Sequence, residues 1–383
     1  MRSTKVLIDL KNLENNFNEI KRNLAKNVKL CTVVKADAYG HGAVEISKKL
    51  AECGSDFLAV ATVEEGAELR QHGIKLPILV LSLCIPEEVD LVVENNLTPL
   101  VFDEEYILLF EKAAERKNCK NFGVHIAVDT GMGRIGCLPE QASDIARFIR
   151  GCPHLALEGM CTHFAVSDSI KPDDIEYTKK QIEAFSFACE SVKKAGINPG
   201  LRHCSASAAL INLPEAGFDM VRAGIILYGY YPDQITKKYL ENKGIKINLK
   251  KVMTLVTKVV SIRSVAKGKS VSYGRTWTAE KDTVVAVLPI GYADGLLRSF
   301  ARILKVKIGR KFYRVCGRIC MDQCMVEIGK NNSEVNRWDD AILFGDGEDG
   351  ELCSAQELAD GTGTISYEIL TGITKRVPRV YIS

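Results

Sequence analysis

The chain has 383 residues, of which 46% are hydrophobic and 26% are charged, and its formal net charge is +3. This length suits two globular domains, and the balanced charge gives no reason to expect a nucleic acid or a membrane surface as partner. No apolar run approaches the ~20 residues that a membrane helix needs, and the N-terminus lacks the apolar core of a signal peptide. The 13 cysteines, an odd number spread along the chain, favour reduced thiols and a cytoplasmic protein.

The first 240 residues alternate short apolar runs with amphipathic stretches. Eight runs with helical patterns between them predict parallel strands and, at this length, a (β/α)8 barrel. An open doubly wound sheet is the alternative, but no G-x-G-x-x-G motif follows the first strand. The strands are predicted at 30–34, 57–61, 78–82, 98–102, 124–128, 157–162, 201–203 and 220–227. A strand at 5–10 precedes them, and it can return to a second domain.

Residues 241–383 have a different sequence pattern from the first 240 residues. A polar and basic stretch at 231–250 leads into β-rich runs separated by turn signals, which predicts a mostly β domain. Its strands are predicted at 252–262, 283–288, 303–308, 312–316, 325–328 and 341–344. The even spacing of Cys316, Cys320 and Cys324 places side chains on one face of a strand, so we interpret them as packing residues and expect no metal.

Lys35 lies at the carboxyl end of the predicted strand 30–34, where Gly40 and Gly42 end the apolar pattern. Burial at such a place disfavours the ammonium form and lowers the pKa of a lysine. A neutral amine there can form a Schiff base with an aldehyde, whereas a lysine that reaches out to solvent is the structural alternative. This segment alone leaves both interpretations open.

Further polar residues lie at other predicted strands: Arg134 on a glycine-rich loop, His163 and Ser207 follow strands, and Arg222 lies inside the apolar run 221–225. Each has a structural alternative. Arg134 could pair with a surface carboxylate or cap a loop, and His163 could be a core histidine. Ser207 could cap a helix, and Arg222 could form a buried ion pair. Because barrel enzymes carry their chemistry at the carboxyl ends of strands, their common location favours a site.

The loops after the seventh and eighth strands commonly bind phosphate in such barrels. Ser207 and the backbone amides of Gly224 and Ile225 fall in these loops. A phosphate site beside a Schiff-base lysine points to pyridoxal 5'-phosphate (PLP) as the cofactor.

Ordered matches along nearly the whole chain resemble the bacterial alanine racemase family. They occur at 33–42, 129–136, 162–165, 221–229, 271–275, 291–295, 317–323 and 367–368. The resemblance implies a barrel followed by a β domain, a homodimer with shared active sites, and PLP-dependent interconversion of L- and D-alanine that supplies peptidoglycan synthesis.

The resemblance also implies roles for single residues. Lys35 would carry PLP and act as one base, and Arg222 and His163 would lie at the pyridine ring. The remaining cofactor and substrate residues of the same copy would be Tyr39, Ser207, Gly224, Ile225 and Tyr367 at the phosphate and Arg134 at the phenolic oxygen.

The partner copy would contribute the second base, Tyr273, together with Met321 at the substrate carboxylate and Tyr292 at the entrance. Positions that match the family's substrate corridor are Asp168, Arg298 and Arg318.

The chain departs from the family pattern at Ala127, where many members have a lysine that is often carbamylated. We expect a chloride ion or ordered water beside Ala127 to orient Arg134 instead. The alternatives for function are a PLP amino acid decarboxylase on the same scaffold and a serine or broad-specificity racemase, although the bulky Tyr367 favours the small alanine side chain. A PLP-binding protein without catalysis would lack the second domain.

Overall fold

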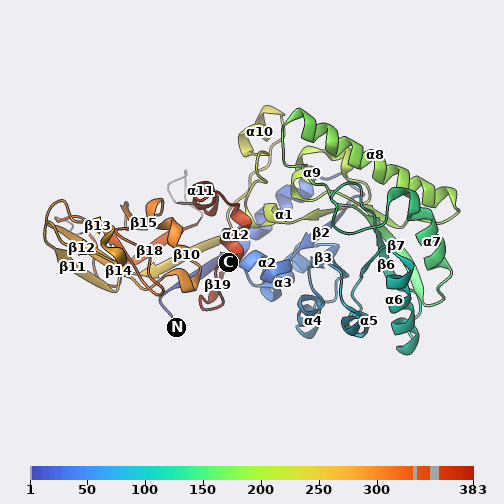
Figure 1. Cartoon of the computed structure of the whole chain (residues 1–383), viewed down its shortest axis with the longest axis horizontal. Coiled ribbons are helices and arrows are strands. Elements are labelled where there is room, and N and C mark those ends of the chain that lie inside the picture. The colour runs from blue at the N-terminus through green and yellow to red at the C-terminus, as the bar shows by residue number, and fades with distance from the viewer. Residues whose placement is uncertain (1, 331–333, 346–352) are drawn as a thin grey trace.

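The computed structural model describes residues 2–330, 334–345 and 353–383, which form an α/β barrel and a β-rich domain beside it (Figure 1). Eight parallel strands, all within the described residues, make two hydrogen-bonded groups, β4-β3-β2-β9 and β5-β6-β7-β8. Their bounds are β2 (Lys29–Val33), β3 (Phe57–Val60), β4 (Ile78–Val80), β5 (Leu100–Val101), β6 (Phe122–Ala127), β7 (Leu155–Cys161), β8 (Leu201–His203) and β9 (Met220–Ala223).

Two contacts close the barrel. A parallel bridge between Leu79 and Thr98 joins the two groups on one side. On the other side, the Arg222 amide donates to the Ser205 carbonyl at 2.9 Å. The predicted (β/α)8 barrel is therefore confirmed.

Three helices of the barrel begin at a short polar side chain that accepts from a free backbone amide. Asp9, Thr62 and Asp103 cap α1, α4 and α6 in this way. The helices of the barrel are α1 (Leu10–Arg22), α3 (Ala43–Cys53), α4 (Val63–Gln71), α5 (Val89–Glu94), α6 (Glu104–Arg116), α7 (Ala142–Arg150), α8 (Pro172–Lys194) and α9 (Ser207–Asn212).

The second domain is built on a sheet of order β16-β15-β18-β10-β1-β19, and it also contains a three-stranded sheet, β11-β14-β17. The first strand of the chain, β1 (Lys5–Asp9), pairs with β10 and β19 in the larger sheet, so the N-terminus lies in this domain. The other strands are β10 (Met253–Lys258), β11 (Ser261–Val265), β12 (Ser270–Val271), β13 (Trp277–Thr278), β14 (Thr283–Leu288), β15 (Lys305–Ile308), β16 (Lys311–Arg314), β17 (Cys324–Glu327), β18 (Asp340–Phe344) and β19 (Arg379–Ile382).

Three further short α-helices follow the barrel strands in the chain: α10 (Lys237–Asn242), α11 (Ala355–Asp360) and α12 (Ser366–Thr371). In Figure 1, α12 lies where the second domain meets the barrel, close to α2 (Lys35–Gly40), the turn that carries the candidate lysine.

Two long runs that were predicted as single strands are interrupted in the structure. The run 252–262 is split because the Val259 amide bonds to Asp339 and the Val260 amide to Val287, which moves the chain from one sheet to another. The run 220–227 ends as a strand at Ala223, and a 3-10 helix at Ile225–Tyr228 follows.

Two further observations concern membranes and metals. Within the described ranges, no helix is long and apolar enough to span a bilayer. The same residues contain no group of three or more histidine, cysteine or carboxylate side chains arranged to hold a metal ion, and all 13 cysteines are free.

Asn16 on α1 fastens this helix to the chain that connects the domains. Its side-chain amide donates to the carbonyls of Leu227 and Lys250, and its carbonyl accepts from the Lys250 amide at 2.7 Å. We predict that Asn16→Ala lowers the free energy of unfolding by about 1–3 kcal/mol, because buried backbone groups lose their partners. Asn18→Ala on the exposed face of the same helix is the matched control, and equal effects in urea unfolding would contradict this role.

Candidate active site

A cavity of about 580 Å³ lies at the carboxyl ends of the barrel strands. Its lining includes every predicted site residue of the barrel and of α12: Lys35, Tyr39, Arg134, His163, Ser207, Arg222, Gly224, Ile225 and Tyr367. Asp168 and Ala127 line it as well. The structure thus brings together residues that are spread over more than 300 positions of the sequence.

Lys35 begins an unusual turn, in which four residues, Ala36 to Tyr39, adopt left-handed backbone angles with φ near 52°. Such a conformation costs non-glycine residues about 1–2 kcal/mol each. Surrounding contacts hold it: Glu65 accepts from the Ala36 amide at 2.6 Å, and Arg379 donates to the Gly40 carbonyl at 2.9 Å. Backbone strain of this kind is typical of functional sites.

The amine of Lys35 lies in a setting that disfavours its charge. Burial lowers the pKa of Lys35, and the nearby Arg134 and Arg222 lower it further, while Glu65 acts in the opposite direction. A lysine with a lowered pKa supplies more of the neutral amine that can attack an aldehyde or accept a proton. Lys35 therefore lines a cavity rather than reaching to open solvent.

The Ser207 hydroxyl accepts from the Gly224 amide at 3.0 Å, so it does not cap the helix that it begins. The structural alternative for Ser207 is thus wrong, because this hydroxyl is engaged by the neighbouring loop. A Cβ atom on Gly224 would lie 2.8 Å from the Tyr39 hydroxyl. Gly224 thereby lets two backbone loops and a phenol converge, which suits a small anionic group such as a phosphate.

Arg222 is 5% exposed, and among the described residues no carboxylate pairs with it. Instead its guanidinium donates to the carbonyls of Thr162, His203 and Cys204, and it lies 2.6 Å from Nδ1 of His203. A buried ion pair between Arg222 and a carboxylate, the structural alternative, is therefore absent from the described residues. Its charge stays available to groups in the cavity.

Two histidines behind Arg222 were not singled out from the sequence. Nε2 of His203 lies 2.8 Å from Nδ1 of His125, and both rings are buried. Because Arg222 can only donate, His203 must accept at Nδ1 and donate from Nε2. Burial and Arg222 lower the pKa of His125 to about 3 and hold the pKa of His203 well below its usual value, so both rings are neutral at physiological pH.

His163 lies on the cavity side of Arg222, with its Nδ1 at 3.4 Å from the guanidinium. Burial, Arg222, Arg134 and Lys35 lower the pKa of His163 to about 3. The ring is therefore a neutral imidazole at physiological pH. With Nδ1 accepting from arginine, its Nε2 carries the proton and can donate.

Arg134 lies on the exposed loop that follows β6, and no ion pair to it occurs in the described part of the chain. Ala127, the last residue of β6, is buried and also lines the cavity. A methyl side chain at this position offers no hydrogen bond to the arginine.

Tyr273, Tyr292 and Met321 lie on the second domain and do not line the cavity of the same copy. All three are exposed, Tyr273 at 70%. Contacts of neighbouring residues connect their loops: the Tyr292 amide donates to the Cys320 carbonyl, and the Ser272 hydroxyl donates to the Arg318 carbonyl. Arg298 also lies on this domain and is exposed.

The residues of the cavity fit PLP. A lysine of lowered pKa can hold its aldehyde, the Ser207–Gly224 loops can hold its phosphate, and a buried arginine without a carboxylate can face its ring nitrogen. These features come from different strands, so they are not a property of one motif.

Comparison with known proteins agrees with this geometry. Residues 8–232 match the model of the alanine racemase N-terminal domain, and residues 252–381 match that of the C-terminal domain. Alanine racemase from Treponema denticola is 50% identical to this chain, covering 100% of it and 99% of that protein. Alanine racemase from Treponema pallidum is 41% identical over 100% of both.

Solved structures give the same result. Alanine racemase from Clostridium difficile superposes with a TM-score of 0.91 at 40% identity, covering 100% of this chain and 96% of that one. The enzyme from Bacillus anthracis with bound L-Ala-P gives 0.90 at 35% identity, with the same coverage. These matches confirm the predicted fold, the isomerisation of alanine and PLP as cofactor, and the chain belongs to the alanine racemase family.

Proposed function

We propose that this chain interconverts L- and D-alanine as a homodimer in which each active site is shared between two copies. The proposal rests on the separation of the two candidate bases within one copy. Lys35 lines the barrel cavity, whereas Tyr273 is 70% exposed on the other domain. A second copy would bring that phenol to the cavity. We further propose that the enzyme is cytoplasmic and provides D-alanine for peptidoglycan.

Racemisation requires that the α-proton leaves one face of the substrate and that a proton returns to the other face. One side chain cannot easily serve both faces, so two bases on opposite sides are needed. Lys35 Nζ would serve one enantiomer and Tyr273 Oη of the partner the other. The lowered pKa of Lys35 supports the first assignment.

A tyrosine with an ordinary pKa of about 10 is a weak source of phenolate at neutral pH. We propose that His163 assists it. Since Arg222 fixes the tautomer of His163, the ring presents an N–H donor from Nε2, and such a donor stabilises a phenolate oxygen.

PLP supplies an electron sink for the negative charge that remains when the α-proton leaves. Tyr39, Ser207, Gly224, Ile225 and Tyr367 would hold its phosphate, and Arg134 would contact its phenolic oxygen. Arginine does not release its proton, so Arg222 would leave the ring nitrogen less electron-withdrawing than an aspartate partner would.

Tyr367 favours alanine over larger amino acids. Its ring lies 5.9 Å from that of Tyr39 and contributes a bulky phenol to the cavity wall. A serine racemase would need a smaller polar group there. The decarboxylase alternative is disfavoured by the full-length relatives, which are alanine racemases.

Complementation between inactive variants tests the shared site. We predict that Lys35→Ala and Tyr273→Phe each lower racemisation by about 100-fold or more, since each removes a base. Mixing the two should restore about a quarter of the parent activity, because half of the dimers would contain one intact site of two. Measurement of D-alanine from L-alanine checks both, and a mixture as inactive as its components would contradict a shared site.

The pH dependence of PLP incorporation tests the electrostatic account of Lys35. A nearby cation disfavours the ammonium, so removing it raises the pKa of Lys35 and leaves less neutral amine at a given pH. We therefore predict that Arg134→Met shifts the rate profile of PLP incorporation into the apoenzyme to higher pH. Arg147→Met on the surface of α7 is the control. A shift to lower pH, or none, would refute the coupling.

We propose that a chloride ion occupies the space beside Ala127 and orients Arg134, because the arginine has no ion-pair partner among the described residues. Crystals grown in bromide should show an anomalous peak in contact with Arg134, and Ala127→Leu should abolish it by filling that space. A map in which apolar side chains of the parent protein fill the same space would overturn the proposal.

A further inference from the structure

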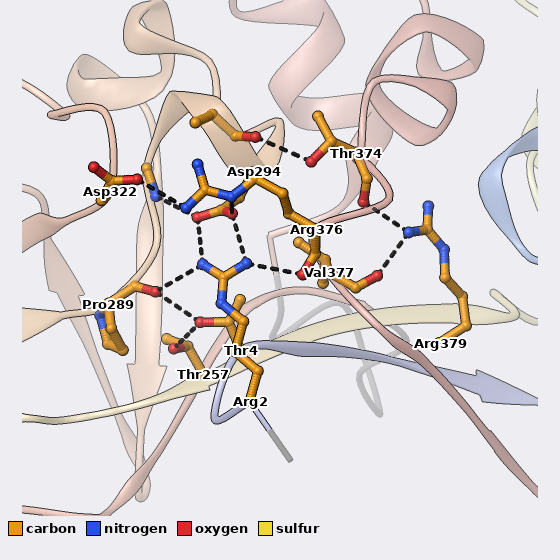
Figure 2. A network of polar contacts seen from close by, with 12 residues as sticks. Arg2, Thr4, Thr257, Pro289, Asp294, Asp322, Thr374, Arg376, Val377 and Arg379 are labelled. Atoms are coloured by element: carbon orange, nitrogen blue, oxygen red, sulfur yellow. Dashed lines mark hydrogen bonds and ion pairs between the residues drawn. The ribbon is translucent and has the colours of Figure 1, made fainter.

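Asp294 is a fully buried carboxylate with four donors around it (Figure 2). The Arg2 guanidinium binds both of its oxygens, at 2.7 and 2.8 Å. The Gly291 amide donates at 3.1 Å, and Nε of Arg376 lies at 3.4 Å. A buried charge with this many partners has a strongly restricted position, because any movement leaves a charged group unpaired.

Arg376 extends this cluster to a second loop. Its guanidinium also donates to Asp322 at 2.8 Å, as Figure 2 shows. Asp322 directly follows Met321, and Asp294 lies two residues after Tyr292. One arginine thus bridges the two loops whose exposed side chains would enter the partner's active site.

Backbone contacts between these loops leave little freedom. The Tyr292 amide donates to the Cys320 carbonyl and the Ala293 amide to the Met321 carbonyl, both at 3.0 Å. A Cβ atom on Gly291 would lie 2.2 Å from the Cys320 carbonyl oxygen. The two loops are therefore fastened to each other, and the buried cluster attaches them to the segments that precede β1 and β19.

A separate branch runs toward the cavity of the same copy. Thr374 donates to the carbonyls of Asp294 and Ala293, and its own carbonyl accepts from Arg379. Arg379 in turn donates to Gly40 in the left-handed turn of Lys35. The two arginines thus fasten different segments: Arg376 contacts Asp294 and Asp322, whereas Arg379 contacts Thr374 and the Lys35 turn (Figure 2).

We propose that Asp294, with Arg2 and Arg376, is a positioning residue that acts on the partner's substrate site by holding Tyr292 and Met321 in place. The inference rests on the proposed shared site. Arg379 provides the contrast, because it fastens the Lys35 turn and so acts within its own copy.

Differently tagged holoenzyme heterodimers test this assignment. In a dimer of Asp294→Asn with Lys35→Ala, the one site with a lysine takes Tyr292 and Met321 from the copy with normal Asp294. We expect the Asp294→Asn homodimer to show a KM for alanine raised by about 10-fold or more, since small misplacements far from the chemistry have large effects. Its visible cofactor spectrum should be unchanged, and the heterodimer should recover the parent KM.

The contrasting variant should behave in the opposite way. A heterodimer of Arg379→Lys with Lys35→Ala uses the altered turn in its one competent site, so the defect of the Arg379→Lys homodimer should persist. Asp340→Asn, which breaks an exposed pair with Lys258, should leave KM unchanged as a control.

A raised KM that persists in the Asp294→Asn heterodimer, or an unchanged KM in its homodimer, would overturn the proposal. If Asp294→Asn does not fold, Arg376→Gln provides the same test, because Arg376 is 48% exposed yet joins both loops. Arg376→Lys should recover part of the loss, since a single amine cannot bridge two carboxylates as a guanidinium does. The mixture of Lys35→Ala and Tyr273→Phe described above tests the shared site itself. If that mixture is inactive, the shared site is wrong, whatever the effect of Asp294→Asn.

Discussion

The electrostatics of the cavity depend on Arg222, a buried arginine that pairs with no carboxylate among the described residues. Arg222 satisfies its donors with three backbone carbonyls and the ring of His203 inside the barrel. Its charge helps to lower the pKa of His163 and of Lys35. The same hydrogen bonds join β9 to the ends of β7 and β8, so contacts between neighbouring strands also lower the pKa values of groups in the cavity.

The two domains divide the work of the site. The barrel supplies Lys35, Arg222 and the loops of Ser207 and Gly224, while the second domain carries the exposed phenols of Tyr273 and Tyr292, which do not line the cavity of their own copy. The left-handed turn after β2 lies between the two, and Arg379 from β19 holds it. A strained turn held by the distant end of the chain makes the position of Lys35 dependent on the whole fold.

Much of this could be predicted from the sequence because buried parallel strands read as continuous apolar runs, and site residues follow such strands. Lys35 and Arg222 were found in this way. The left-handed turn was not, since Ala36 to Tyr39 contain no glycine to signal it. The contact between His125 and His203 joins residues 78 positions apart, and the ion pair of Arg2 with Asp294 joins residues 292 positions apart. Such pairings follow from topology, which no local pattern contains.

The central claim is that the two bases come from different copies and face each other across the cofactor. The most direct measurement is a crystal structure of the dimer with PLP bound. It should place Lys35 Nζ and the Tyr273 Oη of the other copy on opposite faces of the pyridine ring. Both groups on one face, or a Tyr273 that remains in solvent far from any cofactor, would contradict the account.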